Sequence, residues 1–169
     1  MIRKGCMGDF ENLLILYKAI AAQESGWIRT SDEITRDYTK NFITKSLASG
    51  IILVAETEQN QLVGEIHAYK LGPKNFDHIL GELTIGVHPA FQGKGIGKSL
   101  FSTLLDEVIT NNPEILRVEL MVRETNLLAI DLYKKLGFKV EGRYEERVRA
   151  HDIFVADIAM AWFNPNFRE

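Results

Sequence analysis

The spacing of apolar residues near the amino end predicts two helices. Apolar side chains recur at the i, i+3, i+4 and i+7 positions of one helix face: Phe10, Leu13, Leu14, Tyr17 and Ile20. We expect this first helix to start at Asp9, which can cap it, and to end before Gly26. A weaker helical pattern runs from about Asp32 to Ala48 and stops at Gly50. Each helix therefore presents one apolar stripe to a core.

Short apolar or alternating runs predict strands in the rest of the chain, at residues 51–56, 62–71, 79–88, 116–122, 138–149 and 152–163. A third helix follows the glycine-rich segment 92–98, and a fourth covers about Asn126 to Leu136, with Gly137 at the left-handed cap position. This order predicts an α/β fold with a mixed, mostly antiparallel twisted sheet of about six or seven strands flanked by about four helices. Because we find neither an internal repeat nor a linker, residues 1–169 are expected to form a single domain.

The glycine-rich turn at Gly93, Gly95 and Gly97 lies between a strand and a helix. Glycines adopt positive φ and let the backbone approach a ligand closely, while a helix start offers unpaired N–H groups. Lys94 and Lys98 add positive charge. The turn is therefore expected to bind a phosphate group.

Spacing separates three phosphate-binding hypotheses. A dinucleotide fingerprint needs G-x-G-x-x-G, but this turn has G-x-G-x-G and follows no βαβ start. A P-loop needs a glycine five residues before Gly97, where the chain has Gln92, although Lys98 and Ser99 match its end. The third hypothesis, a coenzyme A pyrophosphate loop, fits every position of its pattern.

The segment Gln92-x-x-Gly95-x-Gly97 resembles the [QR]-x-x-G-x-[GA] loop of the GNAT superfamily of acyl-CoA-dependent N-acetyltransferases. The preceding strand, Glu82 to Pro89, resembles the fourth strand of that family. The later pattern Asn126-x-x-Ala129-x-x-x-Tyr133-x-x-x-Gly137-Phe138 resembles its second signature. The resemblance implies a single-domain GNAT fold with splayed central strands and acetyl-CoA as co-substrate. It also implies a cofactor site at Ile85, Val87, Gln92, Gly93, Lys94, Gly95, Ile96, Gly97, Lys98, Asn126 and Tyr133.

Acetyl transfer to an amine requires a proton acceptor, because an alkylamine with a pKa of about 10.4 is mostly protonated at neutral pH. Alternation along strand 79–88 places Glu82 on its polar face, together with Thr84 and Gly86. Glu82 is thus the candidate base, and a solvated or ion-paired strand glutamate is the alternative.

Attack on the thioester creates an oxyanion, which needs hydrogen-bond donors held in place. The resemblance assigns this task to the backbone around Val87, where relatives also pair with the pantetheine arm. Gly86 is expected to permit a bulge that splays this strand from the next.

The departing thiolate needs a proton, and the resemblance makes Tyr133 the candidate acid. Asn126 lies seven residues earlier, so both side chains are expected on one helix face. Asn126 can then bind the cofactor arm. The alternative places Tyr133 in the core stripe of its helix.

Other polar and aromatic residues are expected to be structural. His67, His78, His88 and His151 show no motif with an acidic partner or metal spacing. The mixed charges from Glu141 to Arg149 are typical of a solvated strand face. Trp27, Tyr38 and Tyr69 either line an acceptor pocket or belong to the core, and the loop Gln23-Glu24-Ser25 can border a pocket.

Composition bears on the partners, the compartment and the metal content of the protein. A net charge of −3 argues against nucleic-acid and membrane partners, since no sequence-wide positive field is present. The single Cys6 allows no intramolecular disulfide, no Cys/His group has zinc-ligand spacing, and no apolar run is long enough to span a membrane. We therefore expect a cytoplasmic protein without a metal.

The leading hypothesis is an N-acetyltransferase that moves an acetyl group from acetyl-CoA directly to a primary amine of a small molecule or a protein amino terminus. The alternative is a catalytically silent coenzyme A-binding sensory or interaction module of the same fold. Homodimers are frequent in the superfamily, but the sequence fixes neither the oligomeric state nor the acceptor.

Overall fold

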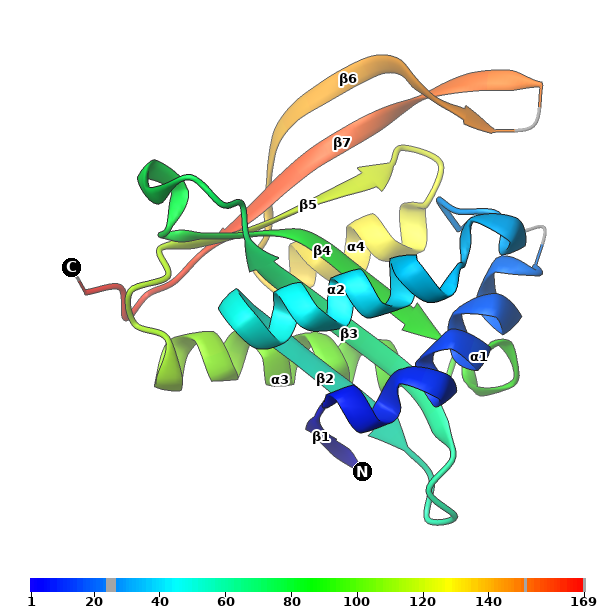
Figure 1. The fold of residues 1–169 in the computed structure, drawn as a ribbon. Coiled ribbons are helices and arrows are strands. Elements are labelled where there is room, and N and C mark those ends of the chain that lie inside the picture. Colours follow the sequence, from blue (N-terminus) through cyan, green and yellow to red (C-terminus); the bar gives the residue numbers. More distant parts are fainter. Residues whose placement is uncertain (24–26, 151, 169) are drawn as a thin grey trace. The chain divides into compact units, whose positions relative to one another are not determined.

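The computed structural model describes every residue except 24–26, 151 and 169 (Figure 1). Its strands are β1 (Ile2–Lys4), β2 (Gly50–Glu56), β3 (Leu62–Lys70), β4 (Ile79–Val87), β5 (Arg117–Arg123), β6 (Lys139–Ala150) and β7 (Ile153–Phe163). Its α-helices are α1 (Phe10–Ala21), α2 (Arg36–Ser49), α3 (Ile96–Asn111) and α4 (Leu127–Lys135). The strands form one seven-stranded sheet in the order β1-β2-β3-β4-β5-β7-β6. Since β4 and β5 are parallel and the other recorded pairs antiparallel, the predicted mixed, mostly antiparallel α/β fold is confirmed.

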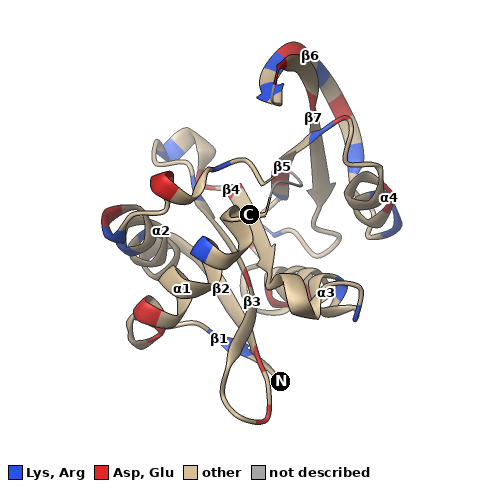
Figure 2. Cartoon of the chain, turned by 90° about the vertical axis from the view of Figure 1, so that its right-hand side faces the viewer, with Lys and Arg blue, Asp and Glu red and all other residues tan. Residues whose placement is uncertain are grey.

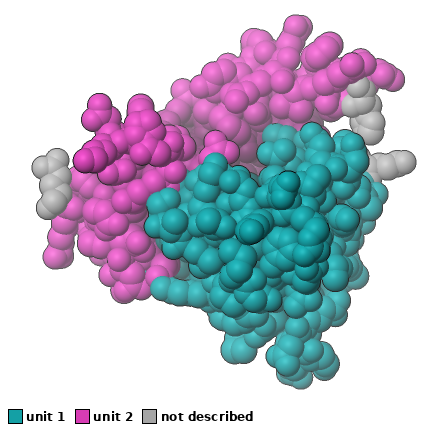
Figure 3. All heavy atoms as spheres, in the orientation of Figure 1, with its two compact units in different colours: residues 1–69, 84–106 teal, residues 70–83, 107–169 magenta. Residues whose placement is uncertain are grey.

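The chain divides into two compact units (Figure 3). Unit 1 comprises residues 1–69 and 84–106, and unit 2 comprises residues 70–83 and 107–169. Strand β4 and helix α3 each contribute residues to both units.

The core of unit 1 lies between β2–β3 and the helices α1 and α2 (Figure 1). The predicted stripe of α1 is confirmed, because Leu13, Leu14, Tyr17 and Ile20 are buried. On the opposite face of β3, a Cβ at Gly64 would lie 3.0 Å from Ile96 and from Leu100 of α3. Both faces of β3 are therefore covered, which explains why most of its residues are buried.

Strand β1 is an element that the apolar pattern did not predict. It is three residues long and pairs antiparallel with β2, with Arg3 opposite Val54. A run this short contains too few residues to show an alternation.

Asp9 stands at the start of α1, as predicted, but its side chain does not cap the helix. Its carboxylate instead accepts two hydrogen bonds from Arg3, at 2.9 and 2.8 Å, and one from the backbone N–H of Cys6 at 2.9 Å. Arg3 also donates to Glu56 at 2.9 Å. The carboxylate therefore joins the first strand to the first helix. Bonding to Arg3 lowers the pKa of Asp9 below its ordinary value.

We expect Asp9→Asn to lower the free energy of unfolding by about 1–2 kcal/mol at pH 7, because it removes charge-assisted hydrogen bonds. The native pKa of Asp9 is lowered, so this stability is present above its ordinary value of 3.8 and is lost as pH falls toward the native value. Urea unfolding at pH 7 and near pH 3 should show a smaller difference between the two proteins at the lower pH. The exposed helical Asp106→Asn is the control; equal losses in both variants would contradict the account.

Unit 2 contains the antiparallel strands β5, β7 and β6 with helix α4. The charges along β6 are mixed in sign (Figure 2), and most residues of the strand are exposed, as predicted for a solvated face. Arg143 bonds to Glu124 at 2.7 Å, and Arg147 lies 3.8 Å from Asp157. The largely exposed Arg143–Glu124 pair contributes little stability, whereas Asp157 is buried.

Candidate functional site

The glycine-rich turn joins the end of β4 to α3 within unit 1. Gly93 and Gly95 have φ of +73° and +80°, and a Cβ on either glycine would meet no atom within 4 Å. These positions need glycine for their backbone conformation rather than for lack of space. The side chain of Gln92 donates to the carbonyl of Val87 at 3.2 Å and so ties the turn to β4.

Helix α3 begins directly after the turn. Its first backbone hydrogen bond runs from Ser99 N–H to Gly95 O at 3.0 Å. The N–H groups of residues 96–98 come before this bond and so have no carbonyl partner within the helix. Lys94 and Lys98 are exposed, and the Lys94 ammonium lies 4.8 Å from the ring centroid of Phe91. Free N–H groups, open space and two cations together form a cradle that fits a pyrophosphate.

At the end of β4, successive residues face opposite sides of the sheet, as alternation predicts. A Cβ at Gly97 would lie 3.8 Å from both Ile85 and Val87, so these side chains pack beneath the start of α3. On the other face a Cβ at Gly86 would lie 2.6 Å from Ile20. Gly86 thus allows the close approach of α1.

The hydrogen bonding of β4 leaves one edge of this segment available. His88 N–H donates to Val63 O at 2.8 Å, and β3 is the neighbour of β4 in the sheet. Because N–H groups along such a strand point alternately to opposite edges, the N–H groups of Ile85 and Val87 point away from β3. They are therefore unused by that ladder.

Glu82 lies in the part of β4 that belongs to unit 2. Its side chain is exposed, but its φ is +51°, a value that few residues other than glycine adopt. The predicted exposure of Glu82 is confirmed, but the regular extended backbone assumed at this residue is wrong. Such strain at a polar residue is common at functional sites.

Tyr133 and Asn126 lie in unit 2, on α4 and at its start. Tyr133 is 8% exposed, its ring centroid lies 6.0 Å from that of Phe138, and burial raises its pKa to about 12. Asn126 precedes the helix, and its Oδ1 accepts from Ala129 N–H at 3.2 Å. The helix expected from Asn126 thus begins one residue later, with Asn126 as its cap. Gly137 has φ of +96°, as predicted for the helix end.

Sequence reasoning missed a buried polar cluster in unit 1. The side chain of His67, expected to lack an acidic partner, has Nδ1 3.0 Å from Oε1 of Glu65, whose other oxygen accepts from the Tyr17 hydroxyl. The signal was the E-x-H spacing on β3, which puts both side chains on one face. Trp27, Tyr38 and Tyr69 are half-buried beside the same core. Glu24, Ser25 and His151 lie outside the described residues.

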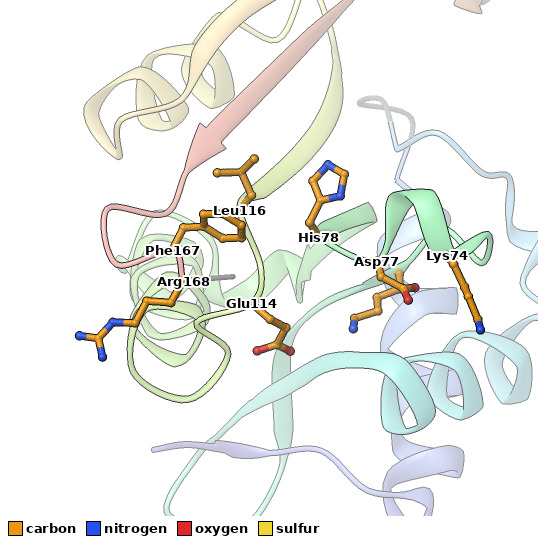
Figure 4. A pocket seen from close by; sticks show the side chains of 8 residues that line it. Lys74, Asp77, His78, Glu114, Leu116, Phe167 and Arg168 are labelled. Atoms are coloured by element: carbon orange, nitrogen blue, oxygen red, sulfur yellow. The ribbon is translucent and has the colours of Figure 1, made fainter.

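A separate hollow of about 550 Å³ lies in unit 2 (Figure 4). Lysines 70 and 74 and Arg168 line it together with Asp77 and Glu114, and it includes none of the predicted site residues. Its mixed charge favours no single ligand. Within the described chain, no three His, Cys, Asp or Glu side chains gather to bind a metal, and no helix is long and apolar enough to cross a membrane.

Comparison with known proteins identifies the family. Residues 48–140 match the model of the acetyltransferase (GNAT) domain, a range that contains the glycine-rich turn, Glu82 and Tyr133. The chain belongs to the GNAT acetyltransferase family.

Curated GNAT relatives differ in their acceptors. The chain is 35% identical over 100 residues to a mycothiol acetyltransferase of Segniliparus rotundus, covering 58% of this chain and 37% of the relative. It is 30% identical over 128 residues to the peptidyl-lysine N-acetyltransferase YjaB of Salmonella typhimurium, covering 69% and 75%. It is 36% identical over 80 residues to the ribosomal protein bS18 alanine N-acetyltransferase of that bacterium, covering 44% and 53%. The matches therefore span between 37% and 75% of these relatives' lengths.

Solved GNAT structures share the fold along nearly the whole chain. An acetyltransferase from Streptococcus pneumoniae superposes with a TM-score of 0.86 at 21% identity, covering 97% of this chain and 98% of that one. A Sinorhizobium meliloti phosphinothricin acetyltransferase in complex with AcCoA has a TM-score of 0.86 at 18% identity, covering 99% and 89%. The GNAT fold predicted from the sequence is thereby confirmed.

Proposed function

We propose that this chain is an acetyl-CoA-dependent N-acetyltransferase that acts as one domain in the cytoplasm and acetylates a primary amine. The acceptor belongs to a small molecule or a protein amino terminus. The observation that carries the proposal is the cradle of Gly93, Gly95 and the start of α3, found in a chain of the GNAT family. The neighbour crystallised with AcCoA supports the same ligand class.

In this proposal the cradle binds the pyrophosphate of acetyl-CoA. Residues Gly93 to Lys98 supply backbone N–H groups and the ammonium groups of both lysines. The edge of β4 that faces away from β3 offers the Ile85 N–H to the pantetheine arm, as an added strand would use it, and leaves the Val87 N–H for the thioester carbonyl.

Three groups then serve the chemistry. Exposed Glu82 accepts a proton from the acceptor ammonium, and the freed amine attacks the thioester carbon. The Val87 N–H stabilises the oxyanion. As the C–N bond forms and the C–S bond breaks, the Tyr133 hydroxyl donates a proton to the thiolate and is reprotonated from solvent.

Thiol release from acetyl-CoA tests the function directly. The purified protein is supplied with a panel of small primary amines and with peptides of different amino termini, and free thiol and acetylated product are measured together. We expect both to rise in equal amounts with at least one acceptor class. Binding of acetyl-CoA without turnover on any acceptor would instead support the silent module.

We expect Gly95→Ala to weaken acetyl-CoA binding about tenfold. A residue other than glycine at φ of +80° costs about 1–3 kcal/mol. We expect the turn to relieve this strain by changing its backbone conformation, which moves the N–H groups that bind the pyrophosphate. Titration calorimetry measures the change. Gly97→Ala is the matched control, because its Cβ would make ordinary contacts at 3.8 Å and its backbone has no positive φ. Equal affinities for the two variants would contradict the cradle.

A further inference from the structure

A tight turn connects β4 to the glycine-rich turn in unit 1. Pro89–Phe91 forms one turn of 3-10 helix, in which Phe91 N–H donates to His88 O at 2.8 Å. The side chain of His88 adds a second bond, because its Nδ1 accepts from Ala90 N–H at 3.2 Å. The ring of Pro89 restricts φ at the first position of the turn. His88 therefore fixes the point from which Phe91 projects, through both its backbone and its imidazole.

The imidazole of His88 also contacts the ring of Phe91. The two ring centroids lie 5.7 Å apart and the ring planes are inclined by 76°, which is the edge-to-face arrangement that aromatic rings favour. The Lys94 ammonium lies 4.8 Å from the centroid of the same Phe91 ring. At this distance the face of an aromatic ring attracts a cation. A chain of contacts thus runs from the end of β4 through His88 and Phe91 to a lysine of the cradle.

The backbone on either side of Lys94 lies in open space. A Cβ at Gly93 or at Gly95 would meet no atom within 4 Å. A lysine in such a place has many rotamers, and it loses this freedom when it binds a phosphate, which weakens the binding. A cation that a ring already restrains loses less freedom when the ligand arrives. The contact with Phe91 is therefore expected to raise the affinity of the cradle.

We propose that Phe91 is a positioning residue of the acetyl-CoA site: its ring, held by His88, orients the Lys94 ammonium for the pyrophosphate before acetyl-CoA binds. The inference rests on the proposed acetyltransferase function, and it assigns to that function a residue that the glycine-rich motif does not include. The role concerns binding of the co-substrate alone, so no covalent bond is formed or broken in it.

A packing role for Phe91 is the alternative, since the ring is half-buried. The two roles differ in what they predict for the lysines. A ring that only packs supports the turn as a whole, so its loss lowers the affinity by the same factor whether or not Lys94 is present. A ring that positions Lys94 has no effect on binding once the Lys94 ammonium is removed. The difference is a coupling between two side chains, which a double-mutant cycle measures.

Titration calorimetry with acetyl-CoA at low salt gives the four dissociation constants of this cycle. Phe91→Leu keeps an apolar side chain but removes the aromatic face, and we expect it to raise Kd about threefold. Lys94→Met removes the ammonium, and we expect a rise of at least the same size. In the double variant, Phe91→Leu should add nothing to the effect of Lys94→Met. Phe91→Tyr keeps the face of the ring and should bind acetyl-CoA as the wild type does.

Lys98 provides the matched control cycle, because it is an exposed lysine in the first turn of α3. The proposal gives Phe91 no part in placing Lys98, so the effects of Phe91→Leu and Lys98→Met on Kd should multiply in the double variant. With an acceptor found in the thiol-release assay, we also expect Phe91→Leu to raise the KM for acetyl-CoA rather than to lower kcat.

The outcomes separate this proposal from the function on which it rests. A wild-type Kd in Phe91→Leu, or effects of Phe91→Leu and Lys94→Met that multiply, would overturn the role of Phe91 and leave the acetyltransferase intact. Wild-type protein that binds no acetyl-CoA would overturn both. If Phe91→Leu does not fold, His88→Asn takes its place in both cycles, since it keeps an acceptor for Ala90 N–H and removes the ring that packs on Phe91.

Discussion

Tyr133→Phe is expected to lower kcat about 10²-fold while the affinity for acetyl-CoA stays unchanged, because a general acid contributes about this much. Burial raises the pKa of Tyr133 to about 12, so the hydroxyl keeps its proton at every pH at which the protein is normally assayed. Transfer from a group of pKa about 12 to a thiolate whose conjugate acid has a pKa of about 8.5 is uphill, so the acid role requires that bound acetyl-CoA lowers the pKa of Tyr133. Single-turnover kinetics at saturating substrates measure the change.

The exposed Tyr144→Phe is the control for Tyr133→Phe, since it removes a hydroxyl from a side chain that is 51% exposed. The ring of Tyr133 packs against Phe138 and is unchanged in the variant, and stabilisation by acetyl-CoA is the check that its fold is kept. Full turnover in Tyr133→Phe would assign the acid to another group and leave Tyr133 as a core residue.

Glu82→Gln is expected to lower kcat/KM for the amine about 10²-fold at pH 7. The loss should shrink toward pH 10–11, because an alkylamine with a pKa of about 10.4 then arrives already neutral and needs no base. The assay is kcat/KM for the amine as a function of pH. Glutamine has the same shape as glutamate, so the substitution should not change the backbone strain at this residue, whose φ is +51°.

Glu58→Gln is the control for Glu82→Gln, because it neutralises an exposed carboxylate in the turn between β2 and β3. A loss in Glu82→Gln that is equally large at pH 7 and pH 10 would indicate a structural role. An activity equal to that of the wild type would leave Glu82 as a solvated strand residue, the alternative that its sequence context allows.

Periodicity predicted most of the fold because most elements have one apolar face. The stripe of α1, the hairpin β2–β3 and the positive φ of Gly137 all follow from local patterns. Strand β1 is too short to show a pattern, and the side chain of Asp9 is taken by Arg3 rather than by the helix. Competition for a carboxylate by a residue outside the helix cannot be deduced from helix-capping preferences.

The part of the site that consecutive residues form could be predicted from the sequence. The turn around Gly95 is such a segment, and its motif, its positive φ values and the helix start agree. The positive φ of Glu82 is not visible in the alternation of β4, which treats every residue as extended. The bond between Tyr17 and Glu65 joins residues 48 positions apart, so only the packing of α1 on β3 reveals it.

The measurement that tests the central claim most directly is thermal unfolding of the wild type and of Gly95→Ala with acetyl-CoA, free coenzyme A and ATP-magnesium in parallel. A ligand present at 100 times its Kd stabilises the native state by about 2.7 kcal/mol. We predict that both coenzyme A species raise the melting temperature of the wild type, that Gly95→Ala shows a smaller rise at the same concentrations, and that ATP-magnesium has no effect. A rise with ATP-magnesium alone, or equal rises in the two proteins with acetyl-CoA, would contradict the assignment of this turn to acetyl-CoA.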